Sequence, residues 1–197
     1  MRKTLANVLT ALALFSVSGN AMAKVFEVDS AHSGITFTVT HLQLSEVEGR
    51  FKDFKGSFNW DAKNPENSSL TFTAQTQSVS TDNEKRDTHL KSDDFFDASK
   101  FPTISFKSTE VKKLSGDRYN ITGQLTAHGV TKTISVPATV KGPIDAFNDG
   151  KESIGFRASF KINRLDYGIG AGWQAGSDKV VGHDVFLTVK GEAHEPE

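Results

Sequence analysis

The chain has 197 residues, of which 23 are basic and 24 acidic, and it contains no cysteine. This length suits one domain with a sizeable core, and the lack of cysteine excludes disulfides and thiolate metal sites. A nearly neutral charge balance argues against a nucleic-acid-binding protein, which normally carries a basic face or stripe.

The N-terminal segment has the pattern of a secretory signal peptide. Arg2 and Lys3 precede an apolar run from Leu5 to Val17, and small residues stand at Ala21 and Ala23, the two positions that a signal peptidase reads. We expect cleavage after Ala23, export to the periplasm, and a mature chain with a formal charge of -3. No later stretch approaches the roughly 20 apolar residues of a membrane span, so stable membrane insertion is not expected.

The mature chain, residues 24–197, alternates apolar and polar residues at the strand period. The alternating segments are 35–40, 70–74, 104–106, 119–121, 134–136, 154–160 and 185–189. Turn signals separate them at 64–65, 115–117, 128–129 and 148–150. We predict one all-β domain of about eight antiparallel strands, either a barrel or a sandwich. In an eight-stranded barrel the interior is filled by side chains or holds one small ligand.

One strand-like stretch changes phase in its middle. Phe51 falls on one parity, whereas Phe54 and Phe58 fall on the other, so both sets face inward only if a bulge near Asp53 shifts the register. Three glycines in strand-like stretches mark further corners or close approaches: Gly49, Gly56 and Gly123.

A polar segment interrupts the strand pattern. Residues 81–84, with the sequence TDNE, fit a capping box and predict a short helix over 82–91. Leu90 is the only large apolar residue of this helix, so it lacks the stripe of an ordinary core helix. Phe95 and Phe96 follow directly. We predict a crossover helix across one end of the barrel, with these three apolar side chains in its mouth.

Phenylalanine dominates the aromatic residues, with 15 Phe against 2 Tyr and 2 Trp. A Phe-rich interior suits either a thick, dry core or a cavity for an apolar guest, because Phe buries a large surface without a polar atom. Composition alone favours the ordinary core.

Several motifs lie in order between Asp29 and Lys190. They are Asp29-x-x-His32-Ser33, Gly49-Arg50-Phe51, Phe54-x-Gly56, Ser78-Val79-x-Thr81, Arg86-Asp87-x-His89-Leu90-Lys91-Ser92-x-Asp94-Phe95-Phe96, Phe101-Pro102-x-Ile104-x-Phe106-x-Ser108 and Gly123-x-Leu125-Thr126-x-x-Gly129-Val130-Thr131-Lys132. The chain thereby resembles the YceI-like family of periplasmic polyisoprenoid-binding proteins over nearly all its mature length. The resemblance implies a lipocalin-like antiparallel β-barrel whose elongated cavity holds an isoprenoid or another long amphiphile. It also implies a possible homodimer.

Together, strand parity and the resemblance favour a cavity over a solid core. The candidate lipid-cavity residues are Ile35, Phe37, Val39, Phe54, Phe58, Phe72, Phe95, Phe96, Phe106, Ile121, Leu125, Phe156 and Phe160. Burial of ten methylenes contributes about 8 kcal/mol before the costs of association, so such a tube needs no catalytic group to bind a prenyl chain.

A pyrophosphate or quinone head needs polar partners near the mouth. The candidates are Arg86, His89 and Lys91, which offer charge-assisted or ordinary hydrogen bonds. The alternative is that Arg86 pairs with a nearby carboxylate, at Asp87, Asp93 or Asp94, and pins the helix to the barrel rim. The sequence does not separate these two interpretations.

Catalytic and metal signatures are weak. A hydrolase triad needs a serine, a histidine and an acidic residue, and the sequence offers Ser33, His32 and Asp29. Neighbouring strand residues point apart, however, and no Gly-x-Ser-x-Gly elbow occurs. The six histidines lack helical zinc spacing, so we expect neither a metal nor another cofactor. We therefore predict a lipid carrier that is not an enzyme, with 82–96 as its lid. Two alternatives stay open: an enzyme acting on the head group of a bound prenyl lipid, and a stress-induced structural protein with a filled barrel.

Overall fold

The structure is a computed structural model that describes residues 23–146, 148–173 and 177–197. The predicted signal peptide therefore lies, except for Ala23, outside the described residues. Within these ranges, no helix is both long enough and apolar enough to cross a membrane.

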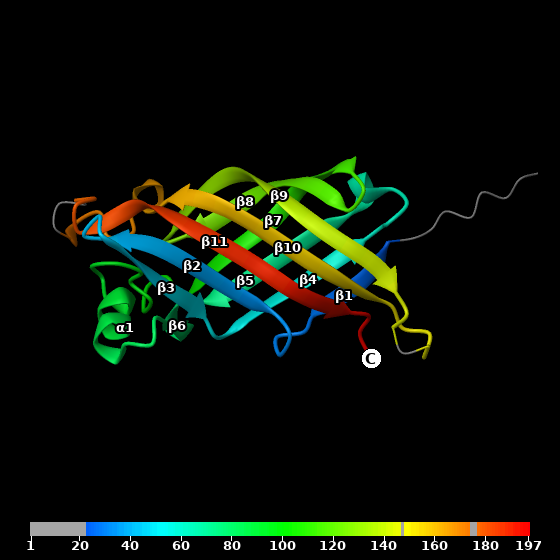
Figure 1. Cartoon of the computed structure of the whole chain (residues 1–197), viewed down its shortest axis with the longest axis horizontal. Coiled ribbons are helices and arrows are strands. Elements are labelled where there is room, and N and C mark those ends of the chain that lie inside the picture. Colours follow the sequence, from blue (N-terminus) through cyan, green and yellow to red (C-terminus); the bar gives the residue numbers. More distant parts are fainter. Residues whose placement is uncertain (1–22, 147, 174–176) are drawn as a thin grey trace, which may run out of the picture.

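The strands form one closed antiparallel barrel (Figure 1). Their bounds are β1 (Lys24–Val28), β2 (Gly34–His41), β3 (Ser45–Phe51), β4 (Phe54–Trp60), β5 (Ser69–Gln75), β6 (Val79–Ser80), β7 (Thr103–Ser115), β8 (Arg118–Ala127), β9 (Val130–Ile144), β10 (Ser153–Asn163) and β11 (Val181–His194). Around the barrel the order is β1-β4-β5-β7-β8-β9-β10-β11, and a pairing between β1 and β11 closes the circle. The predicted eight-stranded, lipocalin-like all-β barrel is confirmed.

Eleven segments make eight long strands because three strands are interrupted. β1 pairs with β4 and β2 with β3, so residues 24–60 form one long broken hairpin. β5 pairs with β4 and β6 with β3 in the same way. The interrupted strand β1 and β2 closes the circle against β11, through two residue pairs of β1 and seven of β2.

A two-residue break, rather than the predicted bulge, shifts the phase between Phe51 and Phe54. β3 ends at Phe51 and β4 begins at Phe54, so the chain changes its pairing partners between them. The amide of Gln75 donates to the carbonyl oxygen of Asp53 at 2.8 Å and holds the break in place. Phe51 and Phe58 are both buried, so residues of both parities face inward, as expected.

The polar segment forms α1 (Glu84–Lys91), which lies at one end of the barrel beside β3 and β6 (Figure 1). None of its residues is fully buried, as expected of a helix without an apolar stripe. The predicted capping box is wrong: Asn83 is the N-cap, and its side chain accepts from the amide of Arg86 at 3.0 Å. Thr81 lies outside the cap: its amide and hydroxyl both donate to Asp87 Oδ1, and its hydroxyl oxygen accepts from Arg86 Nε.

The barrel is sealed at the end opposite α1. Phe26, Trp60 and Tyr119 are at most 5% exposed, and the rings of Trp60 and Tyr119 meet edge to face at 5.0 Å. These side chains belong to one apolar cluster with Phe58 and Phe156. Three short 3-10 turns complete the described elements: η1 (Pro65–Asn67), η2 (Thr76–Ser78) and η3 (Arg164–Tyr167).

The close approaches expected at strand glycines are confirmed. Gly49 lies opposite Phe37, and a Cβ at this glycine would overlap the phenyl ring. Gly56 pairs with Phe72, whose ring would lie 2.7 Å from such a Cβ. The missing side chains allow each ring to lie flat against the opposite strand. An aromatic barrel wall therefore leaves space along the axis.

Candidate ligand cavity

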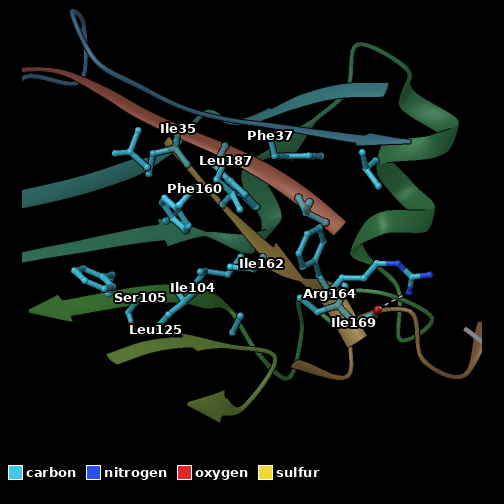
Figure 2. A pocket seen from close by; sticks show the side chains of 18 of the residues that line it. Ile35, Phe37, Ile104, Ser105, Leu125, Phe160, Ile162, Arg164, Ile169 and Leu187 are labelled. Carbon is cyan, nitrogen blue, oxygen red and sulfur yellow. Dashed lines mark hydrogen bonds between the residues drawn. The ribbon is translucent and has the colours of Figure 1, made fainter. Parts of the chain in front are cut away.

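Two apolar cavities lie inside the barrel. The front cavity, about 150 Å³, lies beside the α1 segment, and Leu90, Phe95 and Phe96 form part of its wall. The rear cavity, about 80 Å³, lies nearer the sealed end, where Phe58 and Leu70 line it. All the lining residues of the front cavity are apolar except Ser105 and Arg164 (Figure 2). Such a wall offers hydrophobic contact and almost no directional bonding.

The structure places most of the candidate cavity residues on these walls. The front cavity is lined by Ile35, Phe37, Val39, Phe72, Phe95, Phe96, Phe106, Leu125 and Phe160. The rear cavity adds Phe58, Ile121 and Phe156.

The prediction that Phe54 lines the cavity is wrong, since this residue is on the wall of neither cavity. It is the first residue of β4, directly after the break, and its side chain packs against the cluster that contains Ile35 and Phe51. Parity with Phe58 does not place it on the wall because the strand only begins there.

Part of the front wall escaped the sequence prediction. Val185, Leu187 and Val189 of β11 line the cavity, and their strict alternation was a sufficient signal. Ile169 and Arg164 also line it, but they belong to the irregular segment after β10, where no periodic pattern marks an inward residue.

The segment after α1 covers the front cavity with aromatic rings. Phe95 is 5% exposed, and its ring lies 5.3 Å from that of Trp173. His89 packs edge to face on both rings, at 5.0 and 5.5 Å. Phe96 meets the ring of Phe51 at 5.8 Å. The cover is thus an aromatic layer that rests on the barrel rim.

The predicted head-group residues are placed differently from expectation. None of Arg86, His89 and Lys91 is on the wall of either apolar cavity. Arg86 instead donates to the hydroxyl and carbonyl oxygens of Thr81 at 2.7 and 2.9 Å, and His89 contacts Asp94 at 2.8 Å. Arg86 and His89 bind neighbours within residues 81–94 because α1 turns them away from the apolar interior.

Thr81 is the point at which α1 is attached to the barrel. Burial raises the pKa of Asp87, but hydrogen bonds from the hydroxyl and amide of Thr81 outweigh it, and the pKa of Asp87 is lowered overall. Arg86 binds the same threonine. The predicted pinning of the helix is therefore present, with Thr81 rather than a carboxylate as the group that holds Arg86.

Arg164 is the charged residue of the front wall. The residue is 3% exposed, and its guanidinium donates to three main-chain carbonyls, of Gly182 at 3.0 Å, Ile169 at 2.8 Å and Val181 at 2.9 Å. Burial lowers the pKa of Arg164 from its ordinary value. These bonds clamp the segment after η3 onto the start of β11. Figure 2 shows the bond to Ile169 at one end of the cavity.

The residue types of a hydrolase are present without the required geometry. His32 Nδ1 contacts Asp29 Oδ2 at 2.5 Å, but the Ser33 hydroxyl donates to the carbonyl oxygen of Glu192. No group of three or more histidine or acidic side chains in the described ranges is arranged to hold a metal ion. The arrangement supports apolar binding more directly than chemistry.

A closed eight-stranded antiparallel barrel with an apolar interior and a helix at one end defines a lipocalin-like protein. The YceI-like domain matches residues 26–193, and the chain belongs to the YceI-like family. It is 40% identical to the UPF0312 protein of Pseudomonas aeruginosa over 193 residues, covering 97% of this chain and 98% of that protein.

Solved structures share the architecture. The YceI protein of Campylobacter jejuni matches with a TM-score of 0.72 at 32% identity, covering 96% of this chain and 100% of that one. A polyisoprenoid binding domain from Saccharophagus degradans matches with a TM-score of 0.68, covering 88% of this chain and 99% of that one. At 15% identity, the second likeness concerns the fold alone.

Proposed function

We propose that the barrel binds a polyisoprenoid-type lipid, such as a prenyl chain or an isoprenoid quinone, and carries or sequesters it without chemical change. The observation that carries this proposal is the front cavity, a space inside the barrel whose wall is apolar except for Ser105 and Arg164. Burial of each methylene contributes about 0.8 kcal/mol, so affinity accumulates along the chain. The description of the S. degradans domain as polyisoprenoid-binding supports the same ligand class.

The closed end of the barrel determines the orientation of the ligand. Phe26, Trp60 and Tyr119 seal the end opposite α1, so the chain enters from the lid end with its tail first. The polar head then stays near the lid. Arg164 supplies positive charge at that end of the wall, and Arg86 and Lys91 lie on the lid segment itself.

The cavity volumes require a conformational change on binding. A cavity of about 150 Å³ holds one molecule the size of benzene. The front cavity has this volume, so a chain of several isoprene units enters only when the lid or the lining rings move. Phe95 and Phe96 are the lid groups whose displacement opens the most apolar surface. Exchange of lipid through this movement is part of the proposal.

Export completes the proposal. The signal-peptide pattern before Lys24 and membership of the YceI-like family support a periplasmic location. A carrier in that compartment would shield an apolar chain from water between membranes.

Native mass spectrometry tests the function. The protein, exported by its own signal peptide, is measured intact and then extracted with solvent for lipid identification. We expect a stoichiometric prenyl lipid or quinone. A clean apo mass that also refuses added isoprenoids would contradict the carrier. Incubation with prenyl pyrophosphates in the same experiment distinguishes a carrier from an enzyme, because only an enzyme releases a changed head group.

A further inference from the structure

A group of side chains divides the barrel interior across its middle. Five residues line both the front and the rear cavity: Phe72, Phe106, Leu125, Phe160 and Val189. We call these five residues the partition. They come from five of the eight strand positions around the barrel, β5, β7, β8, β10 and β11, so the partition lies between the two cavities on most sides.

Phe160 is the member of the partition with the greatest freedom to move. Phe72 and Phe106 lie against Gly56 and Gly123, where a Cβ would come within 2.7 and 2.5 Å of their rings. Phe160 has no such backing, and in the described part of the chain no other aromatic ring packs on it. A side chain with empty space on both sides lacks contacts there, so a change of rotamer costs little. In Figure 2 it projects between Leu187 and Ile104.

We propose that the rear cavity is a subsite for the terminal unit of the ligand chain, and that Phe160 gates it. The proposal rests on the proposed function. At about 80 Å³, the rear cavity has roughly half the volume that holds benzene, which suits the branched end of a prenyl chain. Trp60 and Tyr119 prevent further extension. A chain that ends before Phe160 gains nothing from this space, so the barrel selects its ligands by length.

The test fills the rear cavity without touching the front one. Ala138 lines only the rear cavity, and Ala138→Leu adds apolar volume into existing space. Thr139→Leu is the matched control, because the next residue of β9 points to the opposite face of the sheet. Affinities of geraniol, farnesol, geranylgeraniol and solanesol are measured for both variants and for the parent protein.

We expect the parent protein's affinity to rise with chain length and then to level off. Ala138→Leu should weaken binding of the chains on the plateau by about tenfold or more while leaving geraniol unchanged, because loss of two buried methylenes already has that effect. Phe160→Ala, which removes the gate, should speed association of the long chains and not of geraniol. The Thr139→Leu control should follow the parent protein throughout.

Two outcomes overturn the inference in different ways. If the parent protein binds the series and Ala138→Leu weakens every alcohol equally, or none, the rear cavity is not a tail subsite and the proposed function stands. If the parent protein binds no member of the series, the proposed function fails and the subsite fails with it.

Discussion

The contact between Gly49 and Phe37 allows a quantitative test of how the cavity is kept open. The three atoms nearest to a Cβ at Gly49 all belong to the Phe37 ring, so we expect Gly49→Ala to displace this ring rather than the backbone. The ring lines the front cavity, so we expect it to move into that space. Overpacking of this kind costs about 1–3 kcal/mol, and the gain of alanine over glycine in a strand returns about 0.5–1 kcal/mol.

The expected net destabilisation is about 1–2 kcal/mol, or a fall in Tm of roughly 2–8 °C for a chain of this size. Because a phenyl ring is about as large as the molecule that a 150 Å³ cavity holds, prenyl affinity should fall at least about tenfold. Thermal unfolding and equilibrium binding of farnesol measure the two effects. Gly155→Ala is the control, since no heavy atom lies within 4 Å of the added Cβ.

Phe37→Leu removes the overlap and should restore both stability and affinity in the Gly49→Ala background. The four proteins form a double-mutant cycle, in which we expect a favourable interaction energy of about 1–2 kcal/mol between the two substitutions. Strictly additive effects, or an unchanged affinity in Gly49→Ala, would refute the argument that the glycine makes room for the ring.

Three further predictions concern the proposed lid, the contact between Asp29 and His32, and the hydrogen bonds of Arg164 at the front cavity. Joint Phe95→Ala and Phe96→Ala substitution should speed prenyl dissociation by at least about tenfold, because each ring buries apolar surface over the cavity. Phe186→Ala, on the outer face of β11 with 53% exposure, serves as its control, and equal rates would remove the lid role. The side-chain hydrogen bond from His32 lowers the pKa of Asp29, and the same bond raises the pKa of His32 above 6.5. The folded protein therefore binds the imidazole proton of His32 more tightly than the unfolded chain does. The contribution of protonated His32 to the free energy of unfolding is complete below pH 6.5, and it is lost as the pH rises through the pKa of His32 in the folded protein. Thermal unfolding from about pH 6 to about pH 9 should show a steeper loss in the parent protein than in Asp29→Asn, and parallel curves would contradict the linkage. Arg164→Met should destabilise the fold by about 3 kcal/mol, because buried carbonyls lose their donors. Arg118→Met, which removes a single exposed bond to Ser115, should change the denaturant midpoint little; an equal shift in both variants would argue against the clamp.

The sequence predicted the strands well because each strand presents one face to a continuous apolar interior. Alternation alone assigned Phe37, Phe72 and Phe160 to the inner face of the sheet, and all three line the front cavity. The polar helix was also predicted, since a helix with Leu90 as its single large apolar residue cannot belong to an ordinary core.

The wrong or missing predictions concern positions that depend on how distant segments pair, which the local sequence pattern does not determine. The break at residues 52–53 depends on a change of strand partners, which no local signal encodes, and it removed Phe54 from the wall. Arg164 follows a strand in an irregular turn, and its role depends on carbonyls up to 18 residues away. The contact between Gly49 and Phe37 requires the register of two strands, which the sequence of one strand does not contain.

The closure of the barrel has a consequence for folding. The interrupted strand β1 and β2 pairs with β11, so the circle joins residues 24–41 to residues 181–194 and cannot close until β11 has been made. Contacts between such distant residues form late and slowly, because the entropy of a long loop must be lost first. A chain that stays open until its C-terminus emerges remains threadable. For the export that we propose, late closure would lengthen the time before the complete barrel forms, which favours translocation of an unfolded chain.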